Sequence, residues 1–164
     1  MKRLILIVAS AAACSSTATT TAHVDLRAAV ERAPFSLGEY VERAQDSVQR
    51  SAGINARIHR DVDQFAVGAI ASEQRHELRL DFAGYVVSAQ AGGAASAGCQ
   101  TQISLPEALA IAEAEAGGDS VAVVPDDDDP CMREIQVLVD VTLWEVKVGP
   151  GGAIVEKELS DEEL

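Results

Sequence analysis

The sequence predicts an α+β fold of two tandem repeats, each a helix packed on an antiparallel sheet of three to four strands. Two observations support this prediction. The form Ser-Leu-x-Glu occurs at residues 36–39 and again at 104–107, an offset of 68 residues, and each time it opens a stretch with apolar residues at helical spacing. Alternating apolar and polar residues follow at the same offset, which is typical of strands.

Each Ser-Leu-x-Glu segment has the form of a capping box, in which Ser and Glu satisfy the free N–H groups at the start of a helix. The first predicted helix begins after Ser36 and stops at Gly53. The second begins after Ser104 and stops at Gly117–Gly118. A shorter helix is expected at residues 24–33, ended by Pro34.

Strands are expected wherever apolar residues alternate with polar ones. The expected segments are residues 65–71 and 133–139, each followed by two strands joined by a turn. The first turn is at Ala83–Gly84 within residues 78–90, and the second is at Gly149–Gly152 within residues 146–155. The final strand of each repeat, Tyr85–Gln90 and Ala153–Leu159, is expected at an edge of its sheet. Such edges can pair with an extended segment of a partner.

The predicted organisation has five parts. They are a signal peptide at 1–13, a tether with the short helix at 14–35, a first repeat at 36–90, a linker at 91–103 and a second repeat at 104–160. The linker is rich in Gly, Ala and Ser. Each repeat has about 55–60 residues, a size at which burial is marginal, so the two are expected to support each other.

The first residues predict export. Two basic residues precede the ten apolar residues 4–13, which is too short for a membrane span and typical of a signal peptide. Small residues before Cys14 resemble a bacterial lipobox, so Cys14 is the expected lipidation site of a periplasmic or outer-membrane-anchored lipoprotein. The alternative is ordinary cleavage after Ala18 or Ala22.

Cys99 and Cys131 remain as a pair once Cys14 is lipidated or removed. In an oxidising compartment such a pair is expected to form a disulfide. Closing this loop of about 30 residues would stabilise the fold by about 3–4 kcal/mol on the chain-entropy model. Two separate thiols are the alternative.

The second repeat resembles a PepSY domain. The resemblance lies in Ser-Leu-x-Glu-Ala-Leu-x-Ile-Ala at Ser104–Ala112, the strand pattern ending in Trp-Glu-Val-Lys-Val at Val148, and Gly-Gly-x-Ile-Val at Gly151–Val155. Residues 36–90 are a diverged second match. The resemblance implies a helix on an antiparallel sheet. It also implies a role such as peptidase inhibition or folding assistance, because PepSY domains occur in the propeptides of thermolysin-type metallopeptidases. The family has no catalytic motif, so no enzyme activity is expected.

The run Asp126, Asp127, Asp128 and Asp129 is a weak candidate for a Ca²⁺ site, because hard cations bind clustered carboxylates. The run lacks the alternating ligands, central Gly and distal Glu of an EF-hand. Consecutive side chains also point in different directions. A solvated loop is therefore the favoured interpretation, with no metal and no cofactor.

The net charge of the chain bears on which classes of partner it can bind. The formal net charge of −13 argues against nucleic acid, which needs a basic surface. Residues 104–164 contain 16 acidic and 3 basic residues, whereas residues 36–90 contain 8 and 6. The sequence predicts a non-enzymatic binding module of the cell envelope, with an exported peptidase or another envelope protein as partner. Any contact with the membrane would be through the lipid anchor. A Ca²⁺-responsive structural lipoprotein using residues 126–129 is the alternative.

Overall fold

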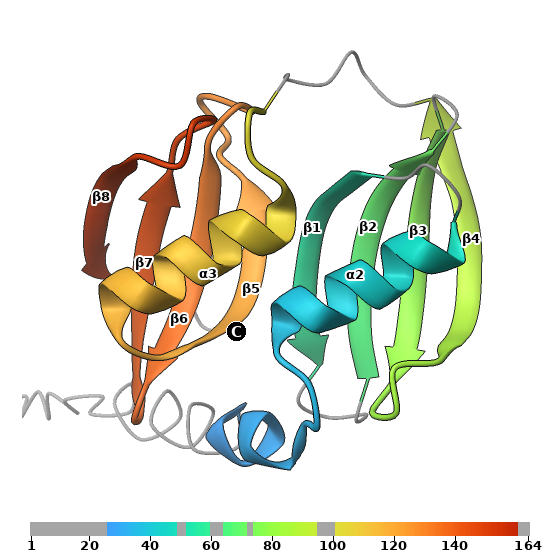
Figure 1. The fold of residues 1–164 in the computed structure, drawn as a ribbon, viewed down its shortest axis with the longest axis horizontal. Helices are drawn as coiled ribbons and strands as arrows, with labels where there is room; N and C mark the ends of the chain where they lie inside the picture. Colours follow the sequence, from blue (N-terminus) through green and yellow to red (C-terminus); the bar gives the residue numbers. More distant parts are fainter. Residues whose placement is uncertain (1–25, 49–51, 60–63, 72–73, 95–100, 161–164) are drawn as a thin grey trace, which may run out of the picture.

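The computed structural model describes residues 26–48, 52–59, 64–71, 74–94 and 101–160 (Figure 1). A short helix at 26–32 precedes helix α2 (Leu37–Ser47), and helix α3 (Leu105–Ala116) divides the strands into two groups. The strands are β1 (Ala52–His59), β2 (Gln64–Ala71), β3 (Gln74–Asp81), β4 (Val86–Ala94), β5 (Asp119–Pro125), β6 (Arg133–Val139), β7 (Thr142–Val148) and β8 (Ile154–Leu159).

All eight strands form one antiparallel sheet in the order β4-β3-β2-β1-β5-β6-β7-β8. The prediction of two tandem helix-on-sheet repeats is therefore wrong. Strands β1 and β5 pair through Ala56 with Val123 and Arg57 with Ala122, which joins the sheet at its centre. The physical reason is that β1 and β5 would otherwise expose unpaired backbone groups beside a buried apolar face.

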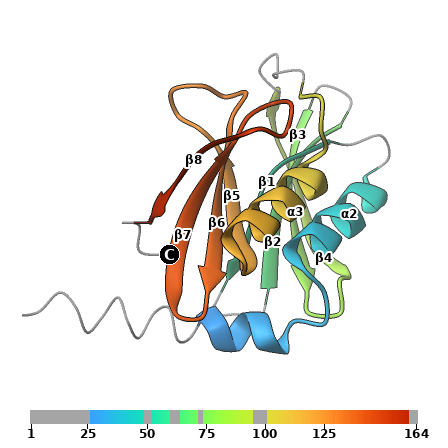
Figure 2. The same cartoon turned by 60° about the vertical axis from the view of Figure 1, so that its left-hand side comes forward.

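The hydrophobic core is also continuous across the centre of the sheet. Helices α2 and α3 lie side by side on the same face (Figures 1 and 2). Helix α2 packs on β1–β3 and β5, and helix α3 packs on β5–β7 and β1. Gly53 of β1 lies beneath both helices. A Cβ atom there would come within 2.9 Å of Leu105 in α3 and 3.0 Å of Val41 in α2. Both helices pack on this position, and the buried apolar residues of the described ranges form one cluster that includes both halves.

Both predicted capping boxes are formed. The Ser36 hydroxyl accepts from the Glu39 N–H, and the Glu39 carboxylate accepts from the Ser36 N–H at 2.8 Å. Ser104 and Glu107 repeat the arrangement at the start of α3. The predicted end of the first helix is wrong, because α2 ends at Ser47 and Gly53 belongs to β1.

Helix α3 ends as expected. Gly117 adopts the left-handed conformation, with φ of 79°, which a residue with a side chain rarely adopts. The next residue, Gly118, leads into β5. A Cβ atom on Gly118 would collide with the backbone carbonyl group of Leu138 in β6. The two glycines therefore allow a tight passage from the helix into the sheet.

An aromatic group fills the core between α2 and the first strands. The ring of Tyr40 stacks on Phe65, with centroids 3.5 Å apart and an interplanar angle of 14°. The Tyr40 hydroxyl donates to the carbonyl oxygen of Phe82 at 2.7 Å. Tyr40 and Phe65 are fully buried. This contact fastens α2 to the β3–β4 turn.

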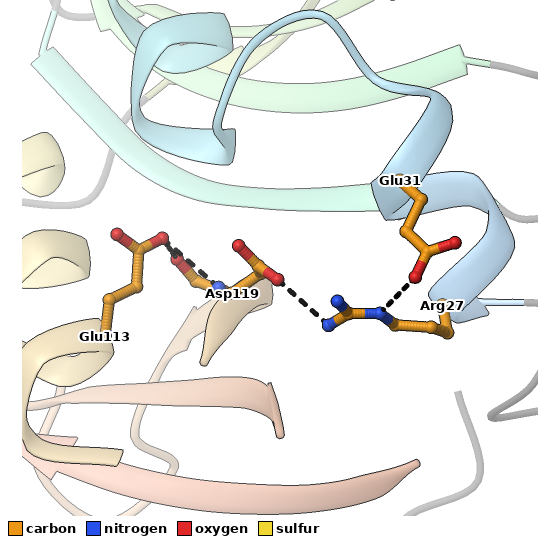
Figure 3. A network of polar contacts seen from close by, with 5 residues as sticks. Arg27, Glu31, Glu113 and Asp119 are labelled. Carbon is orange, nitrogen blue, oxygen red and sulfur yellow. Dashed lines mark hydrogen bonds and ion pairs between the residues drawn. The ribbon is translucent and has the colours of Figure 1, made fainter. Parts of the chain in front are cut away.

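The short helix at 26–32 is held at one end of the sheet by a polar network (Figure 3). Arg27 donates to Glu31 in its own helix at 2.9 Å and to Asp119 at the start of β5 at 3.2 Å. The hydrogen bond with Glu31 and the charge of Asp119 raise the pKa of Arg27. Glu113 of α3 accepts from the Ser120 hydroxyl beside this pair.

Two further features bear on partners. Strands β4 and β8 are the edges of the sheet, as predicted for Tyr85–Gln90 and Ala153–Leu159. Every residue of β8 is exposed, including the apolar Val155 and Leu159.

Among the residues that the structure describes, no helix is long and apolar enough to cross a membrane.

Candidate binding site on the open face of the sheet

The helices α2 and α3 cover one face of the sheet and leave the other open (Figure 2). The open face contains a cavity of about 580 Å³. This volume lies within the range of sites that hold small ligands or short peptide segments, about 300–1,000 Å³. The cavity spans the central strands on both sides of the β1–β5 junction. Its outward-facing lining residues are Asn55, Arg57, Ala66, Gly68, Glu77, Arg79, Ala122, Val124, Glu134, Gln136 and Glu145.

The strand register places the main lining residues in one lateral row. Arg79 pairs with Ala66, Ala66 with Arg57, and Arg57 with Ala122 across β3, β2, β1 and β5. The row continues from Ala122 to Gln136 in β6 and to Glu145 in β7. Directly paired residues of an antiparallel sheet share a face. The row therefore runs from two guanidinium groups to a carboxylate.

The floor of the cavity is made largely of small or apolar residues, together with the buried Gln136 of β6. Ala66 and Gly68 of β2 lie between the side chains of β1 and β3, and Ala122 of β5 is 7% exposed. Val124 of β5 is 44% exposed. Short side chains along β2 and β5 leave the space that longer side chains on β1, β3 and β6 border. The cavity thus has an apolar centre between charged sides.

The first side, here called the arginine bank, consists of Arg57 and Arg79. Neither guanidinium group has an ion-pair or hydrogen-bond partner among the residues that the structure describes. Both side chains are exposed. Glu77 also lines the cavity on this side, so the bank carries a formal charge of +1 with Glu77 included. It is suited to receive an anionic group.

The second side of the cavity is lined by Glu134 and Glu145. Both belong to a cluster, here called the carboxylate bank, around the ammonium group of Lys147 in β7. Its Nζ atom lies 3.4 Å from Glu134, 3.5 Å from Asp126, 3.6 Å from Glu156 and 3.9 Å from Glu145. Four carboxylates around one ammonium group leave a formal charge of −3. This bank is therefore suited to receive a cationic group.

The pKa values in the carboxylate bank reflect this crowding. Burial, together with a hydrogen bond to Asp126, raises the pKa of Glu134. Burial acts to lower the pKa of Lys147, but its hydrogen bond with Glu134 and the surrounding negative charges outweigh it and raise this pKa. The backbone N–H of Asp129 lowers the pKa of Asp126, and the charge of Lys147 contributes.

The acidic run at residues 126–129 does not converge on one point. Asp126 is 7% exposed, and its Oδ1 accepts from the N–H groups of Asp128 and Asp129 while Oδ2 faces Lys147. Asp129 accepts from the N–H of Cys131 at 2.9 Å, and Asp127 and Asp128 are exposed. Within the described ranges, no group of three or more His, Cys, Asp or Glu side chains has the arrangement of a metal site.

The predicted covalent sites fall largely outside the described residues. Cys14 and Cys99 both lie there, as does the signal peptide. Cys131 is half-buried in the β5–β6 loop, directly after Asp129 and Pro130. Lipidation of Cys14 and the Cys99–Cys131 disulfide therefore stay predictions.

Sequence reasoning did not identify the two banks. Alternation along each strand places Arg57 and Arg79 on the polar face, and this signal was available. The arginine bank lies on the same face as Glu134 and Glu145 because β1 pairs with β5. No local sequence pattern predicts that pairing. The role of Lys147 depends on four carboxylates from three strands and a loop.

Comparison with known proteins does not assign a family. No family model matches the sequence. No curated protein matches it either. Among solved structures, a candidate lipoprotein from Clostridium difficile 630 is similar with a TM-score of 0.44 and 12% identity, over 73% of this chain and 90% of that one. A DUF2874 family protein from Bacteroides uniformis ATCC 8492 is similar with a TM-score of 0.27 and 16% identity, over 82% of this chain and 87% of that one. Both similarities are too low to carry a functional argument.

Proposed function

We propose that the chain is a non-enzymatic binding module of the cell envelope, which holds an extended peptide segment of a partner protein in the open-face cavity. The observation that carries the proposal is the cavity itself, whose two sides have opposite charge. Opposite charges on two sides of an apolar floor suit a polypeptide, which offers acidic, apolar and basic side chains in one strand.

An exported peptidase is the partner class that we favour. The support is the PepSY resemblance of residues 104–159, because PepSY domains accompany thermolysin-type metallopeptidases as propeptides. A module of this kind would act by occupying or guiding a peptidase segment and would itself perform no chemistry. Lipid attachment through Cys14 would place the module at the membrane surface, where exported peptidases pass.

The test uses thermolysin as the probe and the soluble chain from residue 15 onward. We expect stoichiometric inhibition of peptide hydrolysis that weakens when Ala66→Leu fills the cavity floor. Ala91→Leu adds the same side chain on the exposed edge strand β4, outside the cavity, and should leave the inhibition unchanged. Equal inhibition by both variants would place the contact elsewhere. Absence of inhibition by the unaltered chain would remove thermolysin-type peptidases as the partner class.

Export and anchoring have their own test. In cells that process lipoproteins, the full chain should enter the detergent phase, and Cys14→Ser should stay in the aqueous phase. If Cys14→Ser partitions like the unaltered chain, the lipid anchor is wrong. An intact mass that corresponds to a chain beginning at residue 19 or 23 would support ordinary signal cleavage instead.

A further inference from the structure

The cavity has a polarity that specifies the chemistry of the peptide it takes. We propose that it binds an extended five-residue segment with an acidic residue at one end, an apolar residue in the middle and a basic residue at the other end. The acidic side chain lies at the arginine bank, and the basic side chain lies at the carboxylate bank. This inference rests on the proposed function and adds the sequence class of the segment.

The spacing of the banks sets the length of the segment. Arg57 in β1 and Glu145 in β7 are separated by three strand-to-strand steps, β1 to β5, β5 to β6 and β6 to β7. At about 4.8 Å per step, the two positions are about 14 Å apart. An extended chain rises about 3.3 Å per residue, so residues i and i+4 are about 13 Å apart. A segment of five residues that crosses the strands thus matches the two banks.

The periodicity of an extended chain determines which residues of the bound segment face the cavity. Residues i, i+2 and i+4 point to the same side. If the two end residues face the banks, the middle residue faces the centre of the cavity. Ala122 and Val124 of β5 give this centre an apolar surface, beside the buried Gln136 of β6. The middle position of the segment is therefore apolar, and positions i+1 and i+3 face solvent and are unrestricted.

The charges of the two banks select against other segments. The Arg57 and Arg79 guanidinium groups have no anionic partner among the described residues, so an acidic side chain at Arg57 meets a donor without a competing carboxylate, with Arg79 two strands further along the row. On the other side, Glu134 and Glu145 line the cavity and share the ammonium group of Lys147 with Asp126 and Glu156. A segment with two acidic ends would be repelled at this bank. A segment with two basic ends would be repelled at the arginine bank.

The experiment compares four blocked peptides against the isotope-labelled soluble chain by NMR titration of backbone amides. The probes are acetylated, amidated Glu-Thr-Val-Thr-Lys and its Gln-Thr-Val-Thr-Gln, Glu-Thr-Val-Thr-Glu and Lys-Thr-Val-Thr-Lys analogues. We expect the first peptide to bind about 5- to 10-fold more tightly than the others, as two exposed ion pairs predict. The amides of Ala66 and Ala122 should shift, and salt should weaken binding.

Variants separate the two banks from the rest of the surface. The double variant Arg57→Gln/Arg79→Gln should abolish the preference for Glu over Gln at the first position. Arg75→Gln removes an exposed arginine from the same strand as Arg79 but outside the cavity, and it should keep that preference. Circular dichroism of each variant checks folding. Because Arg57 and Arg79 are exposed, both substitutions should be tolerated.

Each outcome bears on the inference. Selective binding of the first peptide, lost in the double variant and kept in Arg75→Gln, supports it. Equal binding of all four peptides that Ala66→Leu abolishes overturns the charge pattern and leaves the proposed function standing. No amide shift at millimolar concentrations of the first peptide overturns the inference. Selective peptide binding without thermolysin inhibition supports it while contradicting the proposed partner class.

Discussion

Alkaline pH should destabilise this protein through one phenol group, that of Tyr40. Burial raises the pKa of Tyr40 to about 12, above its ordinary value near 10, and the negative charge of Asp81 contributes while Arg43 opposes it. The fully buried ring and the hydrogen bond to the Phe82 carbonyl both require the protonated hydroxyl. The unfolded chain therefore loses this proton at lower pH than the folded chain does.

The size of the effect follows from the two pKa values. Below pH 10 the phenol is protonated in both states, and its contribution to stability is fully present. As the pH rises from about 10 to about 12, deprotonation of the phenol favours the unfolded state. The free energy of unfolding should fall by about 1 kcal/mol at pH 11 and by about 3 kcal/mol above pH 12, since one pKa unit is worth roughly 1.4 kcal/mol.

The assay compares urea unfolding at pH 8 and pH 11 for the unaltered chain, Tyr40→Phe and Tyr85→Phe. Tyr40→Phe loses the hydrogen bond to Phe82, which should cost about 1 kcal/mol at pH 8, but it should lose less stability than the unaltered chain between the two pH values. Tyr85→Phe removes the only other phenol in the sequence, so its ultraviolet absorbance reports on Tyr40 alone. Ionisation of that phenol near pH 10, or equal losses for the unaltered chain and Tyr40→Phe, would refute the reasoning.

Three further predictions concern local features of the fold. Ser104→Ala should destabilise the protein by about 1 kcal/mol in urea unfolding, because it removes the cap of α3; no loss would mean that the capping box contributes nothing. Gly118→Ala should cost about 2–3 kcal/mol because its Cβ meets a backbone carbonyl, whereas Gly93→Ala has nothing within 4 Å and should change stability by less than about 0.5 kcal/mol. Material from an oxidising compartment should lose about 3–4 kcal/mol on reduction if Cys99 and Cys131 are bonded, and alkylation of both thiols without reductant would contradict the disulfide.

Several elements were predictable because their determinants are local. The capping boxes at Ser36 and Ser104 join groups three residues apart, so four letters of sequence suffice to recognise them. The turn from α3 into β5 similarly depends on two adjacent glycines. The end of α2 was not predictable in this way. Gly53 resembles a helix stop, but its tertiary contacts with Val41 and Leu105 place it in β1.

The candidate site was predictable only in part. Alternation along the strands put Arg57 and Arg79 on one face, yet it could not say what would lie beside them. Likewise, the sequence presents the acidic run at residues 126–129 as one weak candidate for a Ca²⁺ site. In the structure its members separate, and only Asp126 joins the bank around Lys147.

The sequence by itself determined where helices α2 and α3 begin, which strands form the edges of the sheet, and the acidic character of the second half of the chain. These properties depend on neighbours along the chain or on composition. The tertiary structure decided that β1 and β5 pair, which turns two expected sheets into one and places arginines of the first half and carboxylates of the second around one cavity. The sequence alone could not determine this pairing, because it joins Arg57 to Ala122, which are far apart in the chain. Its driving force, the shared burial beneath α2 and α3 and the satisfaction of backbone groups, exists only once both halves are folded.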